Sequence, residues 1–256
     1  AVKKKIAVIG GGIGGMEVAR LCSMMGHTVD LYEKTGRLGG VFIAAAAPDF
    51  KEKDKELIEW YRTQVKKLPI TLHMNTEVKS LSEIQADEIV IATGATPRKL
   101  PITRFEKGIE AIDYLLGNKD VGNKVAVIGG GLTGCEIAYD LAKKGKEPFI
   151  VEMADDLIKA LGICAANSGC LRDLLRYYKV PVYLESTLKE IQDNKVVIQT
   201  PGGEKTLDCD SVVLSVGYVS GTSLAKESSE HVHILGDKCS AEKDRRLHRG
   251  KSLKKC

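Results

Sequence analysis

Two glycine-rich stretches hold the residues best placed to do chemistry. "IAVIGGGIGGMEVA" (residues 6–19) and "VAVIGGGLTGCEIA" (residues 125–138) share the spacing G-x-G-x-x-G. The first glycine of this motif permits a tight turn, the second lets backbone approach a pyrophosphate, and the third lets a helix pack on a strand. The helix start then aims its N–H groups at the phosphates. The motif glycines are Gly10, Gly12 and Gly15 in the first copy and Gly129, Gly131 and Gly134 in the second.

An acidic residue follows each motif at the same distance. Glu33 and Glu152 each lie 18 residues after the last motif glycine, where a second strand ends and a ribose would bind. The Glu152 carboxylate would accept hydrogen bonds from ribose hydroxyls but repel a 2′-phosphate. No arginine is near it in sequence, so the second site favours NADH over NADPH.

The segments around each motif predict a strand, a glycine turn, a helix and a second strand, which is one βαβ unit. In the first unit, Val18, Leu21, Cys22 and Met25 predict the buried face of the helix, which ends near Gly26. Residues 57–68 predict a second amphipathic helix, and residues 86–97, 212–218 and 231–237 predict further strands. A hairpin is expected at residues 201–203. The predicted fold class is α/β, with two Rossmann-like dinucleotide-binding domains.

Composition limits the other classes of protein. The chain has 256 residues, 43% of them hydrophobic, and favours two domains over one. No run of 18 apolar residues exists, so no membrane partner is expected. The seven cysteines are scattered without a C-x-x-C pair, which predicts reduced thiols and a cytoplasmic location.

The placement of charged residues and histidines indicates neither a nucleic-acid site nor a metal site. The chain has a net charge of +4, and residues 238–256 hold eight Lys/Arg against two acids, with no aromatic side chain between the basic residues. We therefore expect a solvated tail and no nucleic-acid partner. His231 and His233 would share one face of a strand, but no third ligand is near them in sequence, so no metal is expected.

The order of these motifs resembles that of flavoproteins with two dinucleotide-binding domains. More narrowly, "GRLGGVFIAAAAPDFKEKDKELIEWYRTQVKKL" (residues 36–68) is similar to the C-terminal region of the 2,4-dienoyl-CoA reductase, enoate reductase and trimethylamine dehydrogenase family of NADH:flavin oxidoreductases. The resemblance implies an FAD domain split into residues 1–98 and 209–256. It implies an NAD domain, residues 99–208, inserted between them.

The resemblance also implies binding residues. For FAD they include the first glycine motif and Glu33, together with Ile13, Gly14, Lys34, Arg37, Gly39, Gly40, Val78, Ala92, Thr93, Gly94 and Asp237. For NADH they include the second motif and Glu152, together with Leu132, Thr133, Glu136, Val216 and Gly217. No catalytic side chain is named, because hydride transfer between two rings needs orientation and neither acid nor base.

Members of this family usually carry an N-terminal barrel with FMN and an iron–sulfur cluster. This chain has neither the barrel nor a clustered cysteine set, so the resemblance implies a fragment of a larger enzyme. In that enzyme NADH reduces FAD, and electrons cross to the cluster and to FMN. The FMN then reduces an α,β-unsaturated acid or thioester.

Two other functions stay open at this point. After Gly236 and Asp237, Arg246 and Leu247 stand where the family has small residues over the flavin ring. This departure motivates a non-redox structural module that holds ADP or one dinucleotide. The third hypothesis is a stand-alone NADH:acceptor reductase of the rubredoxin-reductase type.

Overall fold

Residues 97–218 fold separately from most of the chain on either side of them. The structure is a computed structural model, and it describes residues 2–159, 162–220, 223–227 and 229–236. Unit 1 comprises residues 1–46, 51–96 and 219–256, and unit 2 comprises residues 47–50 and 97–218. The chain returns from unit 2 to unit 1 after residue 218, later than the predicted residue 209. The reason is that the strand Ser211–Leu214 still pairs within unit 2.

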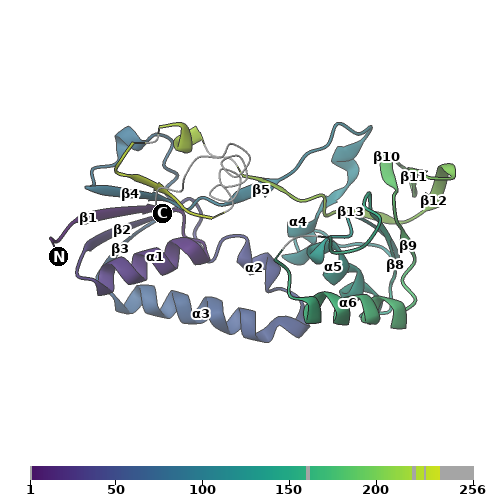
Figure 1. The fold of residues 1–256 in the computed structure, drawn as a ribbon, viewed down its shortest axis with the longest axis horizontal. Coiled ribbons are helices and arrows are strands. Elements are labelled where there is room, and N and C mark those ends of the chain that lie inside the picture. The colour runs from purple at the N-terminus through teal and green to yellow at the C-terminus, as the bar shows by residue number, and fades with distance from the viewer. Residues whose placement is uncertain (1, 160–161, 221–222, 228, 237–256) are drawn as a thin grey trace, which may run out of the picture. The chain divides into compact units, whose positions relative to one another are not determined.

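Unit 1 is built on a five-stranded parallel sheet in the order β15-β4-β1-β2-β3. Figure 1 shows the long helices α1 and α3 side by side along one face of β1, β2 and β3. The elements are β1 (Lys5–Ile9), α1 (Ile13–Met24), β2 (Thr28–Glu33), α2 (Phe42–Ala45), α3 (Glu52–Lys67), β3 (Ile70–Met74), β4 (Glu88–Ile91) and β15 (Val232–Ile234).

Alternate residues of β1 supply the two cores of unit 1. Ile6 and Val8 face the helices and pack with Met16, whereas Ala7 and Ile9 pack on the opposite face of the sheet. This alternation follows from the two-residue repeat of a strand. The buried β-branched runs predicted from the sequence therefore form the centre of the sheet.

The predicted buried face of α1 is wrong. Leu21 and Met25 are exposed, and the residues that point inward are Gly15, Met16, Ala19 and Ser23. Gly15 must face the sheet because its α-carbon packs against the turn backbone, and Ala19 and Ser23 follow it at intervals of one helical turn. Val18 and Cys22 are only partly buried at the edge of this core.

Unit 2 repeats the arrangement with a second parallel sheet, in the order β6-β13-β7-β8-β9. Helices α5 and α6 pack on one face of this sheet, and an antiparallel meander, β10-β11-β12, packs on the other. The elements are β6 (Ile109–Glu110), α4 (Ala111–Leu115), β7 (Lys124–Ile128), α5 (Leu132–Lys143), β8 (Glu147–Val151), α6 (Ala165–Tyr177), β9 (Val182–Tyr183), β10 (Thr187–Gln192), β11 (Lys195–Thr200), β12 (Gly203–Asp208) and β13 (Ser211–Leu214).

The segments that connect the units are short. β5 (Ala95–Pro97) and β14 (Tyr218–Ser220) pair with each other where the chain crosses from one unit to the other. The part of the chain that the structure describes also has single turns of 3-10 helix at Asp49–Lys51, Leu81–Glu83, Phe105–Lys107 and Ser223–Lys226. Among the described residues, no helix combines the length and apolar character needed to cross a membrane.

The α/β prediction is confirmed, with both sheets parallel and both glycine motifs between a strand and a helix. The expected hairpin at residues 201–203 also forms, between β11 and β12.

Candidate dinucleotide-binding sites

The first and third glycines of each motif are required by the fold itself. Gly10 has φ +109° and Gly129 has φ +105°, a region that side chains rarely enter. An added Cβ at Gly15 would lie 1.8 Å from the Gly10 carbonyl oxygen, and one at Gly134 would lie 1.9 Å from that of Gly129. Each helix therefore packs directly on the turn that precedes it.

The middle glycines are not required by the fold. Gly12 has φ −71° and Gly131 has φ −68°, values open to any residue. An added Cβ at either position would have no atom within 4 Å. The protein itself leaves open space beside these two α-carbons, and a phosphate group brought against the backbone would use that space.

Both of these glycines are the N-caps of long helices. Gly12 precedes α1 and Gly131 precedes α5, and neither helix has a capping side chain or an acid in its first turn. The first N–H groups of each helix therefore keep their capacity to donate to an anion, and the helix dipole favours negative charge there. The two sites fit the pyrophosphates of two dinucleotides.

Glu33 holds the first glycine loop in place. Its buried carboxylate accepts hydrogen bonds from the Gly11 N–H at 2.8 Å, the Thr35 N–H at 2.8 Å and the Thr35 hydroxyl at 2.7 Å. Oε2 takes only the Gly11 bond among these, so it retains acceptor capacity for a ribose hydroxyl. The predicted ribose role is compatible with this second, structural role.

Glu152 has the same arrangement in unit 2. Its carboxylate accepts from the Gly130 N–H at 2.5 Å and from the Ala154 N–H at 2.7 Å. The acid that follows each motif therefore organises the glycine turn that would bind the phosphates. The sequence repeat corresponds to a repeated hydrogen-bond pattern.

We expect Glu33→Ala to lower the free energy of unfolding by about 2–3 kcal/mol, because it leaves two N–H groups of the loop without an acceptor. Thermal unfolding of the purified protein measures this loss. Glu77→Ala, which removes an exposed acid of the same unit, is the matched control. Equal stability of the two variants would contradict the structural role of Glu33.

An arginine distant in sequence reaches the loop after β8. The Arg172 guanidinium, carried on α6, donates to an Asp156 carboxylate oxygen at 3.1 Å and to the Leu157 carbonyl at 2.5 Å. It contacts the segment that follows Glu152, where the sequence shows no nearby arginine. Its pairing with Asp156 leaves less of its charge for a ribose phosphate.

The other residues expected at the FAD site lie around the first loop. Gly39 donates from its N–H to the Gly11 carbonyl at 2.8 Å, and a Cβ on Gly40 would lie 3.1 Å from the Gly12 α-carbon. A Cβ added at Gly10 would lie 2.4 Å from the carbonyl oxygen of Ala92. The residues exposed at this end of the sheet and its loops are Gly14, Lys34, Arg37, Thr93 and Gly94.

Two of the expected residues stand apart. The Val78 side chain is buried in the core beneath β4, so only its backbone remains for a cofactor. Asp237 lies outside the described residues, as does the segment with Arg246 and Leu247.

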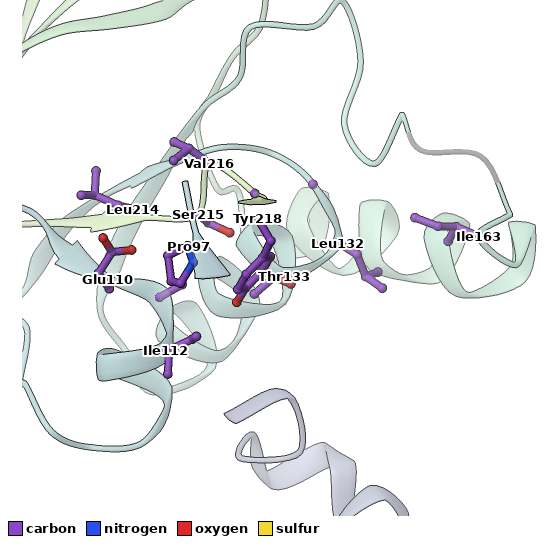
Figure 2. Close-up of a pocket in the computed structure, with 13 residues that line it drawn as sticks. Pro97, Glu110, Ile112, Leu132, Thr133, Ile163, Leu214, Ser215, Val216 and Tyr218 are labelled. Carbon is purple, nitrogen blue, oxygen red and sulfur yellow. The ribbon is translucent and has the colours of Figure 1, made fainter. Parts of the chain in front are cut away.

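In unit 2 a pocket of ≈ 220 Å³ opens at the carboxyl ends of the strands (Figure 2). Five of the expected residues line it: Gly131, Leu132, Thr133, Val216 and Gly217. Glu136 lies further along α5, and Glu152 is not among the lining residues. The predicted NADH cleft is thus brought together in part, around the start of α5 and the end of β13.

The other residues that line the pocket were not predicted as site residues from the sequence. These residues come from the crossing segments, β6, α4, the end of β13 and the loop before α6, and are Pro97, Glu110, Ala111, Ile112, Ile163, Leu214, Ser215 and Tyr218. Their position in the sequence, just after predicted strands, could have indicated them. Residues just after the carboxyl ends of parallel strands gather at one edge of a sheet, whatever their type.

Among the described residues, none of the cysteines and histidines lines the pocket. Burial raises the pKa of the Cys135 thiol to about 12, so this thiol stays protonated and packs inside unit 2. The Glu88 carboxylate bonds Lys4 at 2.5 Å and His233 at 2.8 Å, and these bonds hold the pKa of Glu88 near 2. Within the described ranges, no group of three or more metal-ligating side chains gathers in one place.

Two parallel sheets, each with a glycine turn at a helix start and an acid after the next strand, define a protein class: two-domain dinucleotide-binding oxidoreductases. The family model described as "Pyridine nucleotide-disulphide oxidoreductase" matches residues 4–235. The chain therefore belongs to the pyridine nucleotide-disulphide oxidoreductase family, and it is an FAD- and NAD(P)H-binding flavoprotein domain.

Known relatives agree with this family. Cinnamate reductase of Clostridium sporogenes is 40% identical over 91% of this chain and 36% of its own length. NADH oxidase of Thermoanaerobacter brockii is 33% identical over 81% of this chain and 36% of its own length. The solved structure of a 2-naphthoyl-CoA reductase with 2-naphthoyl-CoA superposes with a TM-score of 0.83 at 32% identity, over 93% of this chain and 37% of that one.

These relatives confirm the resemblance to the enoate and dienoyl-CoA reductases. The chain spans just over a third of the length of each of the three.

Proposed function

We propose that this chain is the NADH-dependent electron-transfer module of a larger reductase, with FAD bound by unit 1 and NADH by unit 2. When bound, NADH supplies a hydride and FAD accepts it. The observation that supports this proposal most is the repeated open space at Gly12 and Gly131. The fold requires no glycine at either position. A pyrophosphate bound against each helix start does require glycine there, because it would occupy the space of a side chain.

The residues of unit 1 suit a flavin dinucleotide. Gly12, Ile13 and Gly14 would bind the pyrophosphate, and Glu33 would accept from the adenosine ribose. The loop at Gly39 and Gly40 already lies against the Gly12 backbone, where the flavin chain would pass. Asp237 and the segment after it are proposed to complete the site.

The residues of unit 2 suit NADH better than NADPH. The Glu152 carboxylate would accept from the adenosine ribose and repel a 2′-phosphate. Two basic side chains lie at this loop, and both are already paired, Arg172 with Asp156 and Lys159 with Asp155. We therefore expect NADH to be the preferred reductant.

The rest of the proposed enzyme lies outside this chain. By analogy with the family, an N-terminal barrel carries FMN and an iron–sulfur cluster and reduces an α,β-unsaturated acid or thioester in the cytoplasm. The names of the relatives, cinnamate reductase and 2-naphthoyl-CoA reductase, support this substrate class.

Absorbance spectroscopy of the purified protein tests the proposal. We expect the visible band of oxidised flavin, and we expect anaerobic NADH to bleach it faster than NADPH at equal concentration. Flavin and nicotinamide would each bind with one molecule per chain. A protein that binds one nucleotide per chain with flavin in excess, or that keeps its flavin oxidised under NADH, would contradict the relay.

A further inference from the structure

Glu110 is an acidic side chain at the pocket of unit 2, at the N-cap of α4, and its carboxylate makes no capping hydrogen bond to that helix. It is the last residue of β6, it is partly buried, and it lines the pocket together with Ser215 and Tyr218. Within the described residues, its carboxylate has no hydrogen-bond or ion-pair partner. Burying a carboxylate in this way costs free energy, which a ligand of opposite charge would offset.

The strand order shows which part of a dinucleotide would reach Glu110. In the sheet β6-β13-β7-β8-β9, Glu152 follows β8 and Gly131 follows β7. A dinucleotide with its adenosine ribose at Glu152 and its pyrophosphate at Gly131 extends in the other direction, past β13 to β6. In Figure 2, Glu110 lies at one side of the group of lining residues and Ile163 at the other, with Thr133 and Leu132 between them.

We propose that the Glu110 carboxylate faces the nicotinamide half of the bound nucleotide and discriminates between its two redox forms, favouring NAD⁺ over NADH. The ring of NAD⁺ carries a positive charge and the ring of NADH carries none, so a nearby carboxylate attracts the oxidised form alone. This inference rests on the proposed binding of NADH by unit 2.

Tighter binding of the oxidised form has a consequence for electron transfer. By thermodynamic linkage, a site that prefers NAD⁺ makes bound NADH a stronger reductant than free NADH. Glu110 would thus help drive electrons from nicotinamide to flavin. This role requires neither proton transfer nor a direct bond to the reacting carbon.

Other charges around Glu110 set the size of the effect. Burial is the main cause that raises the pKa of Glu110, and the Asp113 charge on α4 raises it further, while Lys99 and Lys119 oppose the shift. Tyr218, which also lines the pocket, has its own pKa raised by burial and stays neutral at physiological pH. Because solvent and the two lysines screen the carboxylate, we expect about a tenfold preference.

The pH dependence follows from the raised pKa of Glu110. The carboxylate is charged above its pKa, so the preference for NAD⁺ is present there. The preference falls as the pH drops through that value, which lies above the value of an ordinary glutamate.

The test compares two dissociation constants on the flavin-loaded protein, for NAD⁺ and for tetrahydro-NAD, a redox-inert mimic of NADH with an uncharged ring. Isothermal titration calorimetry measures both. We expect Glu110→Gln to weaken NAD⁺ about tenfold relative to the mimic. Glu106→Gln, which removes an equal charge from an exposed residue outside the pocket, should leave the ratio unchanged.

An unchanged ratio in Glu110→Gln, or equal weakening of both ligands, would overturn the inference and leave NADH binding by unit 2 intact. A wild-type protein that binds neither ligand would overturn the proposed function, and the inference with it. If the variant fails to fold, the wild-type ratio measured against pH decides. A preference for NAD⁺ that falls with acidification supports the role of Glu110, and a flat ratio refutes it.

Discussion

Replacing Gly131 with alanine should weaken nicotinamide nucleotide binding about 100-fold and leave the melting temperature of the protein unchanged. The new methyl group would meet no protein atom within 4 Å, and the backbone angles of Gly131 suit alanine. The methyl group would occupy the space into which the pyrophosphate must come. Loss of charge-assisted hydrogen bonds to the helix start costs about 2–3 kcal/mol, which corresponds to a change of roughly 100-fold.

Calorimetric titration with NAD⁺ measures the loss of affinity, and differential scanning fluorimetry measures the melting temperature. Gly169→Ala is the matched control, because Gly169 lies in α6 with no atom near its missing Cβ. We expect this control to keep full affinity. If Gly131→Ala bound NAD⁺ as the wild type does, the phosphate site would have to lie elsewhere.

The same reasoning shows why so much of the fold could be predicted from the sequence. The glycines, the acids at Glu33 and Glu152, and the buried β-branched runs act through local geometry. A tight turn, a close approach and a strand centre each require particular residue types. Two copies of one pattern then determine two parallel sheets, as the structure shows.

The errors arose where long-range packing decides. The apolar residues Leu21 and Met25 suggested the buried face of α1, but Gly15 determines that face because it alone can touch the turn backbone. The sequence alone predicts a return crossing near residue 209, because a buried strand carries no mark of which sheet it joins. Residues 211–214 pair with β7, and the boundary moves accordingly.

The pocket residues were missed for a related reason. Glu110 and Ser215 are far apart in sequence, and only the strand order brings β6 beside β13. Arg172 reaches Asp156 because α6 packs in unit 2 near the loop after β8. No local motif encodes such neighbours, since the signal is the order of strands and not the type of residue.

Alanine at Gly15 or Gly134 should have the opposite effect to alanine at Gly131, with a loss of stability of about 3 kcal/mol or more. The added Cβ would lie 1.8 Å from the Gly10 carbonyl oxygen or 1.9 Å from that of Gly129. Real Cβ atoms do not approach another atom so closely, so the helix must move away from its sheet. The packed interior has little room for that movement.

Fluorescence separates the two units, because the protein has a single tryptophan, Trp60, which lies in unit 1. Its ring contacts Tyr61 and the Arg20 guanidinium, so unfolding of unit 1 changes its emission. We expect Gly15→Ala to lower the urea midpoint of the Trp60 transition. Gly134→Ala should act mainly on the circular dichroism transition of unit 2. A Trp60 midpoint that Gly15→Ala leaves unmoved would mean that α1 does not depend on close contact with the turn.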